Sequence, residues 1–186
     1  MQKRKDWNGL IAGFKASDLV FLDESGCNTD MTRRYAYSLG GSRAVDSAPL
    51  SKTRNTTILS SIQLDGTLHY TTFSGGTTVE RFKRYLETDL LPHLNGDSIL
   101  IMDNMKSHHA KAVKNLLDSS GVRYIYLPPY SLDLNPIEKL WSKVKSFLRK
   151  FKARTLDALP NAIQRAFQTV SPSDCSGWFK SCDYLH

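Results

Sequence analysis

Short apolar runs that stop at polar or turn-forming residues occur five times along the chain, and they predict five β-strands. The Asp65-Gly66 pair between the second and third runs is typical of a tight hairpin, so these two strands should be antiparallel. A helical segment separates the last two runs, and strands joined in this way usually lie parallel in one sheet. The strand candidates are residues 18–24, 56–63, 67–73, 98–102 and 122–127.

Between and after these runs, apolar residues recur at three- and four-residue spacing, which is the period of an amphipathic helix. Thr77 and Glu80 match a capping box for the first helix. Asn135 and Pro136 fit the cap and the first residue of the longest one. The helix candidates are residues 77–92, 108–119 and 136–152, followed by a short helix around 156–167. The pattern predicts an α/β fold with a five-stranded mixed sheet, three antiparallel strands then two parallel ones, flanked by helices.

A single domain accounts for most of the 186 residues, and 40% hydrophobic composition is enough for a core. The polar and basic residues 1–17 should form an N-terminal arm, which is too short to be a domain. Residues 18–152 should form the α/β domain, and residues 153–186 a C-terminal helical extension.

The composition of the chain indicates what kind of partner the protein binds and in which cellular compartment it works. The formal net charge of +7 favours a polyanion, of which nucleic acid is the commonest. Three cysteines without a CxxC spacing indicate unpaired thiols in a reducing interior. No apolar run approaches the roughly 20 residues that span a bilayer, and the first residues lack a signal-peptide pattern. We therefore expect a soluble, cytoplasmic protein without a membrane partner.

Three acidic residues stand where predicted elements begin or end. Asp23 ends the first strand, Asp103 follows the fourth, and Glu138 opens the helix after the fifth. Because the carboxyl ends of parallel strands meet at one edge of a sheet, these carboxylates should converge there. Converging carboxylates repel unless a cation neutralises them, and oxygen ligands select Mg²⁺ or Mn²⁺. The sequence predicts a metal site, with Glu24 directed to the opposite face of its strand.

Each acid also has a structural interpretation. Asp23 resembles a turn or capping residue, and Asp103 resembles an Asp-Asn turn. Glu138, at the third helical position, would normally reach back to the cap. Asp133 is the rival third ligand, although a loop acid more often stabilises its own turn. His108 is either a core or helix-start histidine or a weaker ligand candidate.

Basic residues near these acids are candidates for DNA contacts. Lys145 and Arg149 follow Glu138 on the border of the apolar face of the last long helix, where they could line a groove. Further arginines and lysines surround two tyrosines in the segment 25–54, for which a solvated loop or a loosely paired ribbon is the simpler interpretation. The DNA-binding candidates are Lys145, Arg149, Arg33, Arg34, Arg43, Lys52 and Arg54.

Three motifs together resemble the catalytic domain of mariner-type DDE transposases, and more closely their bacterial insertion-sequence branch. They are Phe-Leu-Asp-Glu-Ser-Gly around Asp23, Met-Asp-Asn-Met-Lys-Ser-His from Met102, and Pro-Pro-Tyr-Ser-Leu-Asp-Leu-Asn-Pro-Ile-Glu ending at Glu138. Thirty-four residues separate Asp103 from Glu138, a spacing that is similar to the family's. Leu132 stands where the family usually has proline, which would loosen this loop without removing a ligand.

The resemblance implies an RNase H-like fold over roughly residues 18–150 and DNA cleavage and joining with two metal ions, Mg²⁺ or Mn²⁺ as a substitute, at TA target sites. It implies double-stranded DNA as the partner and a homodimer as the active complex. Asp23, Asp103 and Glu138 carry over as the catalytic and metal-binding triad. The supporting residues of the site are expected to be Asn104, His108, Asn135 and Trp141.

Mariner-like enzymes recognise transposon ends with helix-turn-helix modules placed before the catalytic domain, and residues 1–17 are too few to form one. We therefore expect a separate or fused helix-turn-helix half, and a bacterial, nucleoid-associated location. Two alternatives remain open from the sequence: an RNase H-like endonuclease that only hydrolyses DNA, and a non-catalytic DNA-binding or assembly subunit derived from a transposase.

Overall fold

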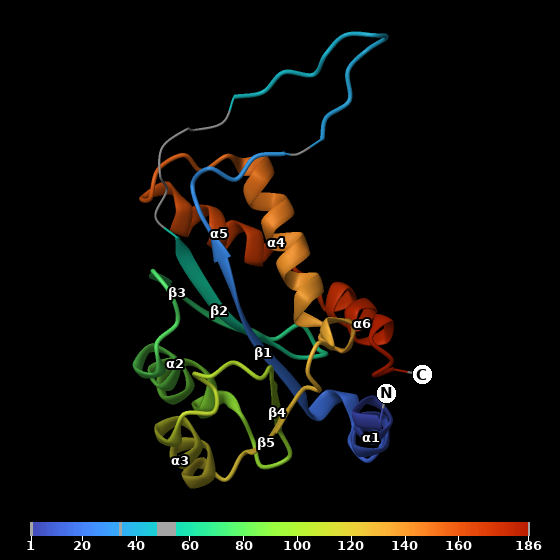
Figure 1. Cartoon of the computed structure of the whole chain (residues 1–186), viewed down its shortest axis with the longest axis vertical. Coiled ribbons are helices and arrows are strands. Elements are labelled where there is room, and N and C mark those ends of the chain that lie inside the picture. The colour runs from blue at the N-terminus through green and yellow to red at the C-terminus, as the bar shows by residue number, and fades with distance from the viewer. Residues whose placement is uncertain (1, 34, 48–54, 186) are drawn as a thin grey trace.

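Five strands form one mixed sheet in the computed structural model, which describes residues 2–33, 35–47 and 55–185. The strand order across the sheet is β3-β2-β1-β4-β5 (Figure 1). The order and the directions of the strands confirm the predicted α/β fold and its mixed sheet. The strands are β1 (Leu19–Cys27), β2 (Thr56–Ile62), β3 (Leu68–Ser74), β4 (Ile99–Met102) and β5 (Arg123–Tyr126).

The register of the sheet brings the ends of distant segments together. β1 pairs antiparallel with β2, so that Asp23 lies opposite Ser60. β1 also pairs parallel with β4, and Leu22 lies opposite Met102. Asp23 follows Leu22, and Asp103 follows Met102. The two acids therefore stand at the same edge of the sheet, as expected for the carboxyl ends of parallel strands.

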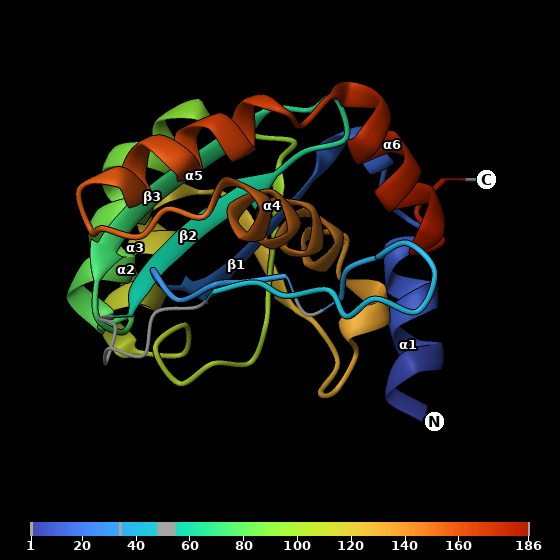
Figure 2. The same cartoon turned by 90° about the horizontal axis from the view of Figure 1, so that it is seen from above.

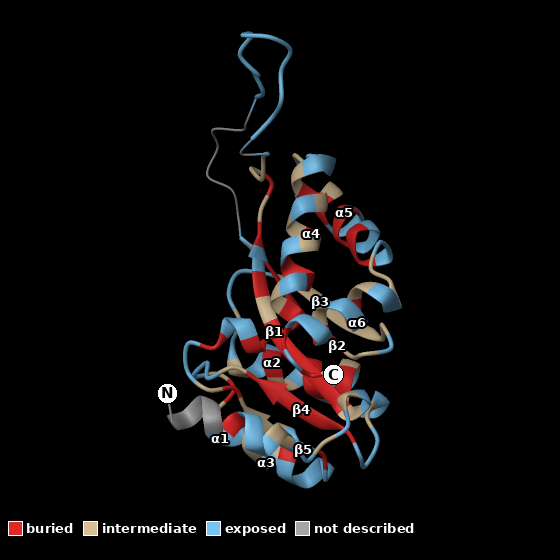
Figure 3. Cartoon of the chain, turned by 90° about the vertical axis from the view of Figure 1, so that its right-hand side faces the viewer, coloured by how far each residue is buried: buried red, intermediate tan, exposed pale blue. Residues whose placement is uncertain are grey.

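Helices cover both faces of the sheet (Figures 1 and 2). Alternate residues of β1 enter different cores: Phe21 packs with α1, α4, α5 and α6, whereas Leu22 packs with α2 and α3. The central strands β1, β2 and β4 are largely buried between these layers, whereas the edge strands β3 and β5 are mostly half-buried (Figure 3). The buried position of β1 and β4 fixes the sheet edge that carries the acids. The helices are α1 (Gln2–Ile11), α2 (Val79–Tyr85), α3 (Lys111–Ser120), α4 (Ile137–Phe151), α5 (Ala158–Gln168) and α6 (Pro172–Ser181).

Two predicted helix starts are wrong by one residue. Thr78, not Thr77, caps α2, because its hydroxyl accepts a hydrogen bond from the Arg81 backbone N–H. Pro136, not Asn135, is the cap residue of α4. The Asn135 backbone is extended, and its amide side chain is buried against Asp23 instead of capping the helix. For Asn135 this contact with a distant residue, which local sequence does not show, competes with the capping role.

The two ends of the described chain are more ordered than the sequence predicts. The N-terminal arm forms helix α1, and Trp7 on this helix is buried in the core. Residues after 152 form α5 and α6, and Phe179 of α6 packs edge-on against Phe21 of β1, with 5.3 Å between the ring centroids. The C-terminal helices therefore share one core with the central strand of the sheet.

The long connection between β1 and β2 extends away from the body of the protein (Figure 1). Its described part, residues 28–33 and 35–47, contains no helix or strand, which agrees with the predicted loop. Arg33 and Arg43 are exposed there. Three further DNA-binding candidates lie outside the described residues: Arg34, Lys52 and Arg54.

The cysteine prediction is confirmed, because all three thiols are unpaired and buried. Among the described residues, no helix is both long enough and apolar enough to cross a membrane.

Candidate active site

Asp23 is the most buried of the three acids and is held by donors from two distant segments. The Glu24 backbone N–H donates to its Oδ1 at 2.7 Å. Trp141 Nε1 and Asn135 Nδ2 donate to its Oδ2 at 3.2 and 3.4 Å. Burial raises the pKa of Asp23 to about 7, and the charges of Asp103 and Glu138 add to this rise. The carboxyl group is therefore fixed in place by uncharged donors, and its burial disfavours the charged form.

Asp103 follows β4 and points its Oδ1 toward two donors. The Met105 backbone N–H lies 2.9 Å from this oxygen and His108 Nδ1 lies 2.8 Å from it. Burial opposes ionisation, but these two hydrogen bonds outweigh it, so the pKa of Asp103 is below its usual value. Asp103 is therefore an anionic carboxylate at neutral pH, beside a carboxyl group that resists ionisation.

Glu138 enters the site from the first turn of α4, where it is half-buried. Burial raises the pKa of Glu138; the charge of Lys145 opposes this rise and that of Asp103 adds to it. No side chain makes a capping hydrogen bond at the start of α4. The capping interpretation of Glu138 therefore does not hold in this structure, and its carboxylate belongs electrostatically with Asp103 and Lys145.

All three acids line a single open cleft of about 970 Å³. β1, the loop after β4, the loop after β5 and the start of α4 form its walls. Trp141 and Lys145 of α4 line the same cleft, and so does Asp133, the rival ligand, which lies in a short 3-10 helix before α4. Residues far apart in the sequence thus bring the three predicted carboxylates to one solvent-accessible space, which Glu24 and Asp133 also line.

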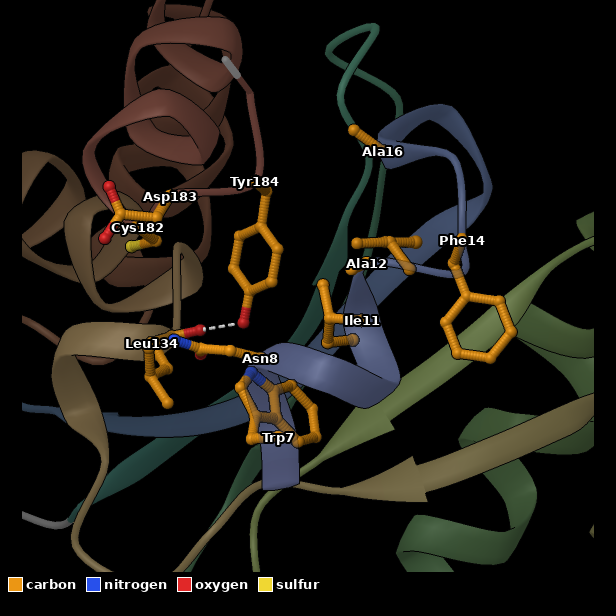
Figure 4. A pocket seen from close by; sticks show the side chains of 11 residues that line it. Trp7, Asn8, Ile11, Ala12, Phe14, Ala16, Leu134, Cys182, Asp183 and Tyr184 are labelled. Atoms are coloured by element: carbon orange, nitrogen blue, oxygen red, sulfur yellow. Dashed lines mark hydrogen bonds between the residues drawn. The ribbon is translucent and has the colours of Figure 1, made fainter. Parts of the chain in front are cut away.

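Two hydrogen bonds hold the loop that leads to Glu138, one from the wall of the cleft and one from behind it. The Asn104 side-chain amide donates to the Leu127 carbonyl at the start of this loop. Tyr184 follows α6 in the chain, and its hydroxyl donates to the Leu134 carbonyl at 2.7 Å (Figure 4). The tyrosine ring also borders a cavity of about 330 Å³ lined by Trp7 and Ile11 of α1. Both ends of the described chain therefore pack behind the loop that carries the third acid.

The donor set of the cleft suits a hard divalent cation. Its acidic side chains offer carboxylate oxygens beside the cationic Lys145, and the buried Asn135 Oδ1 has no hydrogen-bond partner in the part of the chain that the structure describes. Oxygen donors of this kind are what Mg²⁺ and Mn²⁺ take. Across that same part, no three acidic, histidine or cysteine side chains lie close enough together to enclose one ion. The chemistry of the donors, rather than a preformed cage, therefore supports the fit.

The predicted basic residues fall into two groups. Lys145 lines the acid cleft and, together with Arg149, lines a neighbouring groove of about 370 Å³ that continues along β1 to Asp30 and Met31. Arg33 and Arg43 lie on the extended connection after β1, and neither lines the acid cleft. The structure therefore brings Lys145 and Arg149 close to the acids and leaves the two loop arginines apart from them.

Sequence reasoning missed the contact between Glu24 and His108. Glu24 was assigned only to the opposite face of β1, and no partner was predicted for it. In the structure its Oε2 lies 3.2 Å from His108 Nε2. Burial lowers the pKa of His108, but hydrogen bonds to Asp103 and Glu24 outweigh this effect and raise it to about 9. The only sequence signal for this contact is that both residues lie next to the acid motifs.

Comparison with protein families gives the class of this α/β domain and its acidic cleft at the sheet edge. Residues 18–160 match the family described as DDE superfamily endonuclease, and the chain belongs to this family. No curated protein sequence is significantly similar to the chain.

Solved structures of Mos1 transposase have the same fold. The paired-end complex of Mos1 transposase with the left transposon end superposes with a TM-score of 0.81 and 17% identity, covering 97% of this chain and 57% of that one. The Mos1 catalytic domain with raltegravir and Mg gives a TM-score of 0.72 and 16% identity, covering 98% and 89%. The likeness confirms the RNase H-like transposase fold, while the bacterial insertion-sequence branch stays a prediction. The chain spans less than two thirds of the longer Mos1 chains.

Proposed function

We propose that this chain is the catalytic domain of a transposase that cuts double-stranded DNA and joins the cut end to a target. The observation that carries the proposal is the single cleft onto which β1, the loop after β4 and the start of α4 each present a carboxylate. A groove bearing Lys145 and Arg149 adjoins this cleft and offers a path for a polyanionic strand. Acids without such a groove would fit a small-molecule site equally well.

In this proposal Asp23, Asp103 and Glu138 hold two Mg²⁺ ions, for which Mn²⁺ can substitute. When bound, such ions activate the attacking oxygen and stabilise the leaving oxygen in an in-line displacement at phosphorus. Trp141 and Asn135 orient the Asp23 carboxylate through their hydrogen bonds. Mos1 paired-end complexes have been solved with Mg and with Mn, which supports this choice of ion.

Lys145 and Arg149 would position the DNA by contacting its phosphates. Both side chains are partly buried on one side of α4, and Lys145 reaches the acid cleft itself. A cation beside the acids would attract the backbone of the strand to be cut without reading its sequence. Arg33 and Arg43, together with Arg34, Lys52 and Arg54, are proposed to contact DNA farther from the cleft.

The remaining partners follow from the likeness to transposases. The Mos1 relatives are described in complexes with transposon ends and in a strand transfer complex. We propose that this domain acts as a homodimer on DNA, inserts at TA sites, and relies on a separate or fused helix-turn-helix half for end recognition. In the insertion-sequence setting it would work in the bacterial cytoplasm, at the nucleoid.

A joining assay tests the central proposal against simple hydrolysis. The protein is mixed with a pre-cleaved transposon-end duplex bearing a 3′-hydroxyl, a supercoiled target plasmid and Mg²⁺ or Mn²⁺. We expect covalent joining of the duplex to the plasmid, enriched at TA. Plasmid nicking without any joined product would identify a hydrolytic endonuclease, and neither reaction would identify a non-catalytic DNA-binding subunit.

Changing Lys145 and Arg149 together to alanine should weaken binding to all DNA sequences alike. If each cation contacts one phosphate, the slope of log Kd against log salt should fall by roughly two. Fluorescence anisotropy with a labelled duplex over a series of salt concentrations measures this slope. The exposed pair Lys180 and Lys111 provides a control of equal charge away from the groove. A slope equal to that of the control would show that Lys145 and Arg149 form only a solvated face.

The domain alone should bind DNA with little preference for sequence, because electrostatic contacts to phosphates do not distinguish bases. Affinities for a terminal-repeat duplex and for a scrambled duplex of equal length are compared at moderate salt. Dedicated sequence readers prefer their sites by roughly a thousandfold or more. A preference above about a hundredfold would place end recognition within these residues and remove the need for a helix-turn-helix half.

A further inference from the structure

The imidazole of His108 lies between two carboxylates that come from different parts of the sheet. Its Nδ1 is 2.8 Å from Asp103 Oδ1, and its Nε2 is 3.2 Å from Glu24 Oε2. Nδ1 also lies 3.3 Å from the Asp103 carbonyl oxygen. Glu24 directly follows Asp23 on β1, and its backbone N–H donates to Asp23. One ring therefore connects the segment of the first acid to the side chain of the second.

The ring is held so that it cannot easily leave this position. The His108 side chain has no exposed surface, and it stacks on Phe82 of α2 with 4.2 Å between the ring centroids. The Tyr126 hydroxyl donates to the His108 carbonyl at 3.0 Å, which fixes the backbone as well. Glu24 is also largely buried, with its side chain 10% exposed. A buried ring with a partner at each nitrogen has one available orientation.

The contact with His108 determines which oxygen of Asp103 is left to face the cleft. Oδ1 accepts hydrogen bonds from both the Met105 backbone and His108 Nδ1. A carboxylate oxygen has two lone-pair directions in its plane, so these bonds occupy Oδ1. Oδ2 is then the oxygen that Asp103 presents to the space shared with Asp23 and Glu138.

We propose that His108, anchored by Glu24, is a positioning residue that presents Asp103 to a divalent cation through the single oxygen Oδ2. The inference rests on the proposed metal-dependent function of the cleft. His108 touches neither DNA nor the ion in this proposal, and it acts only through Asp103. Outer partners of this kind typically contribute 10- to 100-fold in metal affinity or activity.

The two ring nitrogens can be tested separately with amide side chains. The amide nitrogen of asparagine occupies a place close to Nδ1, so His108→Asn keeps the bond to Asp103 and loses the bond to Glu24. The longer His108→Gln places its amide nitrogen near Nε2, so it keeps the bond to Glu24 and loses the one to Asp103. The two variants have neutral side chains of the same chemistry, and they differ in which carboxylate they can reach.

Mn²⁺ affinity is measured on the DNA-free protein by calorimetry, together with the melting temperature without metal. We expect His108→Gln to weaken Mn²⁺ binding by about 10- to 100-fold and His108→Asn to weaken it much less. Glu24→Leu, which removes the anchor and leaves the ring, should fall between them. His93→Gln is the matched control, because His93 also stacks on a ring, that of His69, and does not line the acid cleft, and we expect unchanged Mn²⁺ affinity.

The outcomes separate this inference from the function on which it rests. If the wild-type protein neither binds Mn²⁺ nor cuts DNA, the proposed function fails and the inference fails with it. If the wild-type protein binds and cuts, but His108→Gln and His108→Asn bind Mn²⁺ equally well and differ only in melting temperature, His108 is a packing residue and the inference alone is overturned. If either variant fails to fold, the other variant and Glu24→Leu decide the question by the same measurement.

Discussion

Replacing Asp23 or Asp103 with asparagine, or Glu138 with glutamine, will reduce Mg²⁺-dependent nicking to background while the protein stays folded. Each change keeps the size of the side chain and removes the negative charge that we propose holds a cation. Loss of an outer partner already costs 10- to 100-fold, so loss of a direct ligand should exceed about a hundredfold. Nicking of supercoiled plasmid over a series of Mg²⁺ and Mn²⁺ concentrations measures the effect.

Folding is followed on the same samples by thermal melting without divalent ions. Burial raises the pKa of Asp23, and so do the charges of Asp103 and Glu138, so a neutral side chain at this position removes an unfavourable charge. We expect a melting temperature within about 4 °C of wild type, the shift that 1 kcal/mol produces in a protein of this size. Asp97→Asn, at an exposed position before β4, is the control that should cut normally. If Glu138→Gln still cuts at the wild-type rate, Asp133 becomes the third ligand.

Removing residues 153–186 will unfold the protein. These residues contribute large side chains to the core that packs on β1 and α4, and each such side chain typically contributes about 2–5 kcal/mol. A whole domain is usually stable by only about 5–15 kcal/mol. The core residues lost are Ala153, Leu159, Ala162, Ile163, Ala166, Phe167, Phe179, Cys182 and Tyr184. Circular dichroism of the shortened chain should show no cooperative melting transition.

A single substitution in α6 tests the same contribution to stability with a smaller, measurable loss. Phe179→Ala removes a fully buried ring that contacts Phe21 and should cost about 3–5 kcal/mol in the free energy of unfolding. Lys180→Ala, at the next and exposed position of α6, should change it by less than about 0.5 kcal/mol. A shortened chain that melts cooperatively near the wild-type temperature would show that residues 153–186 are an independent attachment.

Much of the fold could be predicted because its signals are local. Apolar runs and an Asp-Gly turn are properties of neighbouring residues, and they place all five strands within a few residues of the observed bounds, apart from the longer end of β1. The antiparallel and parallel pairings follow from how the strands are connected. The convergence of Asp23 and Asp103 on one edge follows in turn from the parallel pairing of β1 with β4.

Features that depend on contacts between distant segments could not be predicted. Asn135 has the sequence context of a helix cap, yet its amide turns inward to Asp23, 112 residues earlier in the chain. The contact of Glu24 with His108 could not be predicted either, because the alternation of side chains along a strand indicates only the face of the sheet and not the partner on that face. The tail after Pro172 lacks a clear periodic pattern, although it forms α6 and buries Phe179.

The hydrogen bonds around the cleft also bear on the order in which the chain folds during synthesis. Asp23 leaves the ribosome early, but its partner Trp141 follows 118 residues later. Tyr184, which holds the Leu134 carbonyl, is made a further 50 residues after that loop residue. Contacts of such long sequence separation form late in folding, because the intervening chain must first be closed. A nascent chain that has exposed all three acids therefore still lacks the Tyr184 bond to the loop before Glu138. We expect the proposed cleavage of DNA only after α6 has docked.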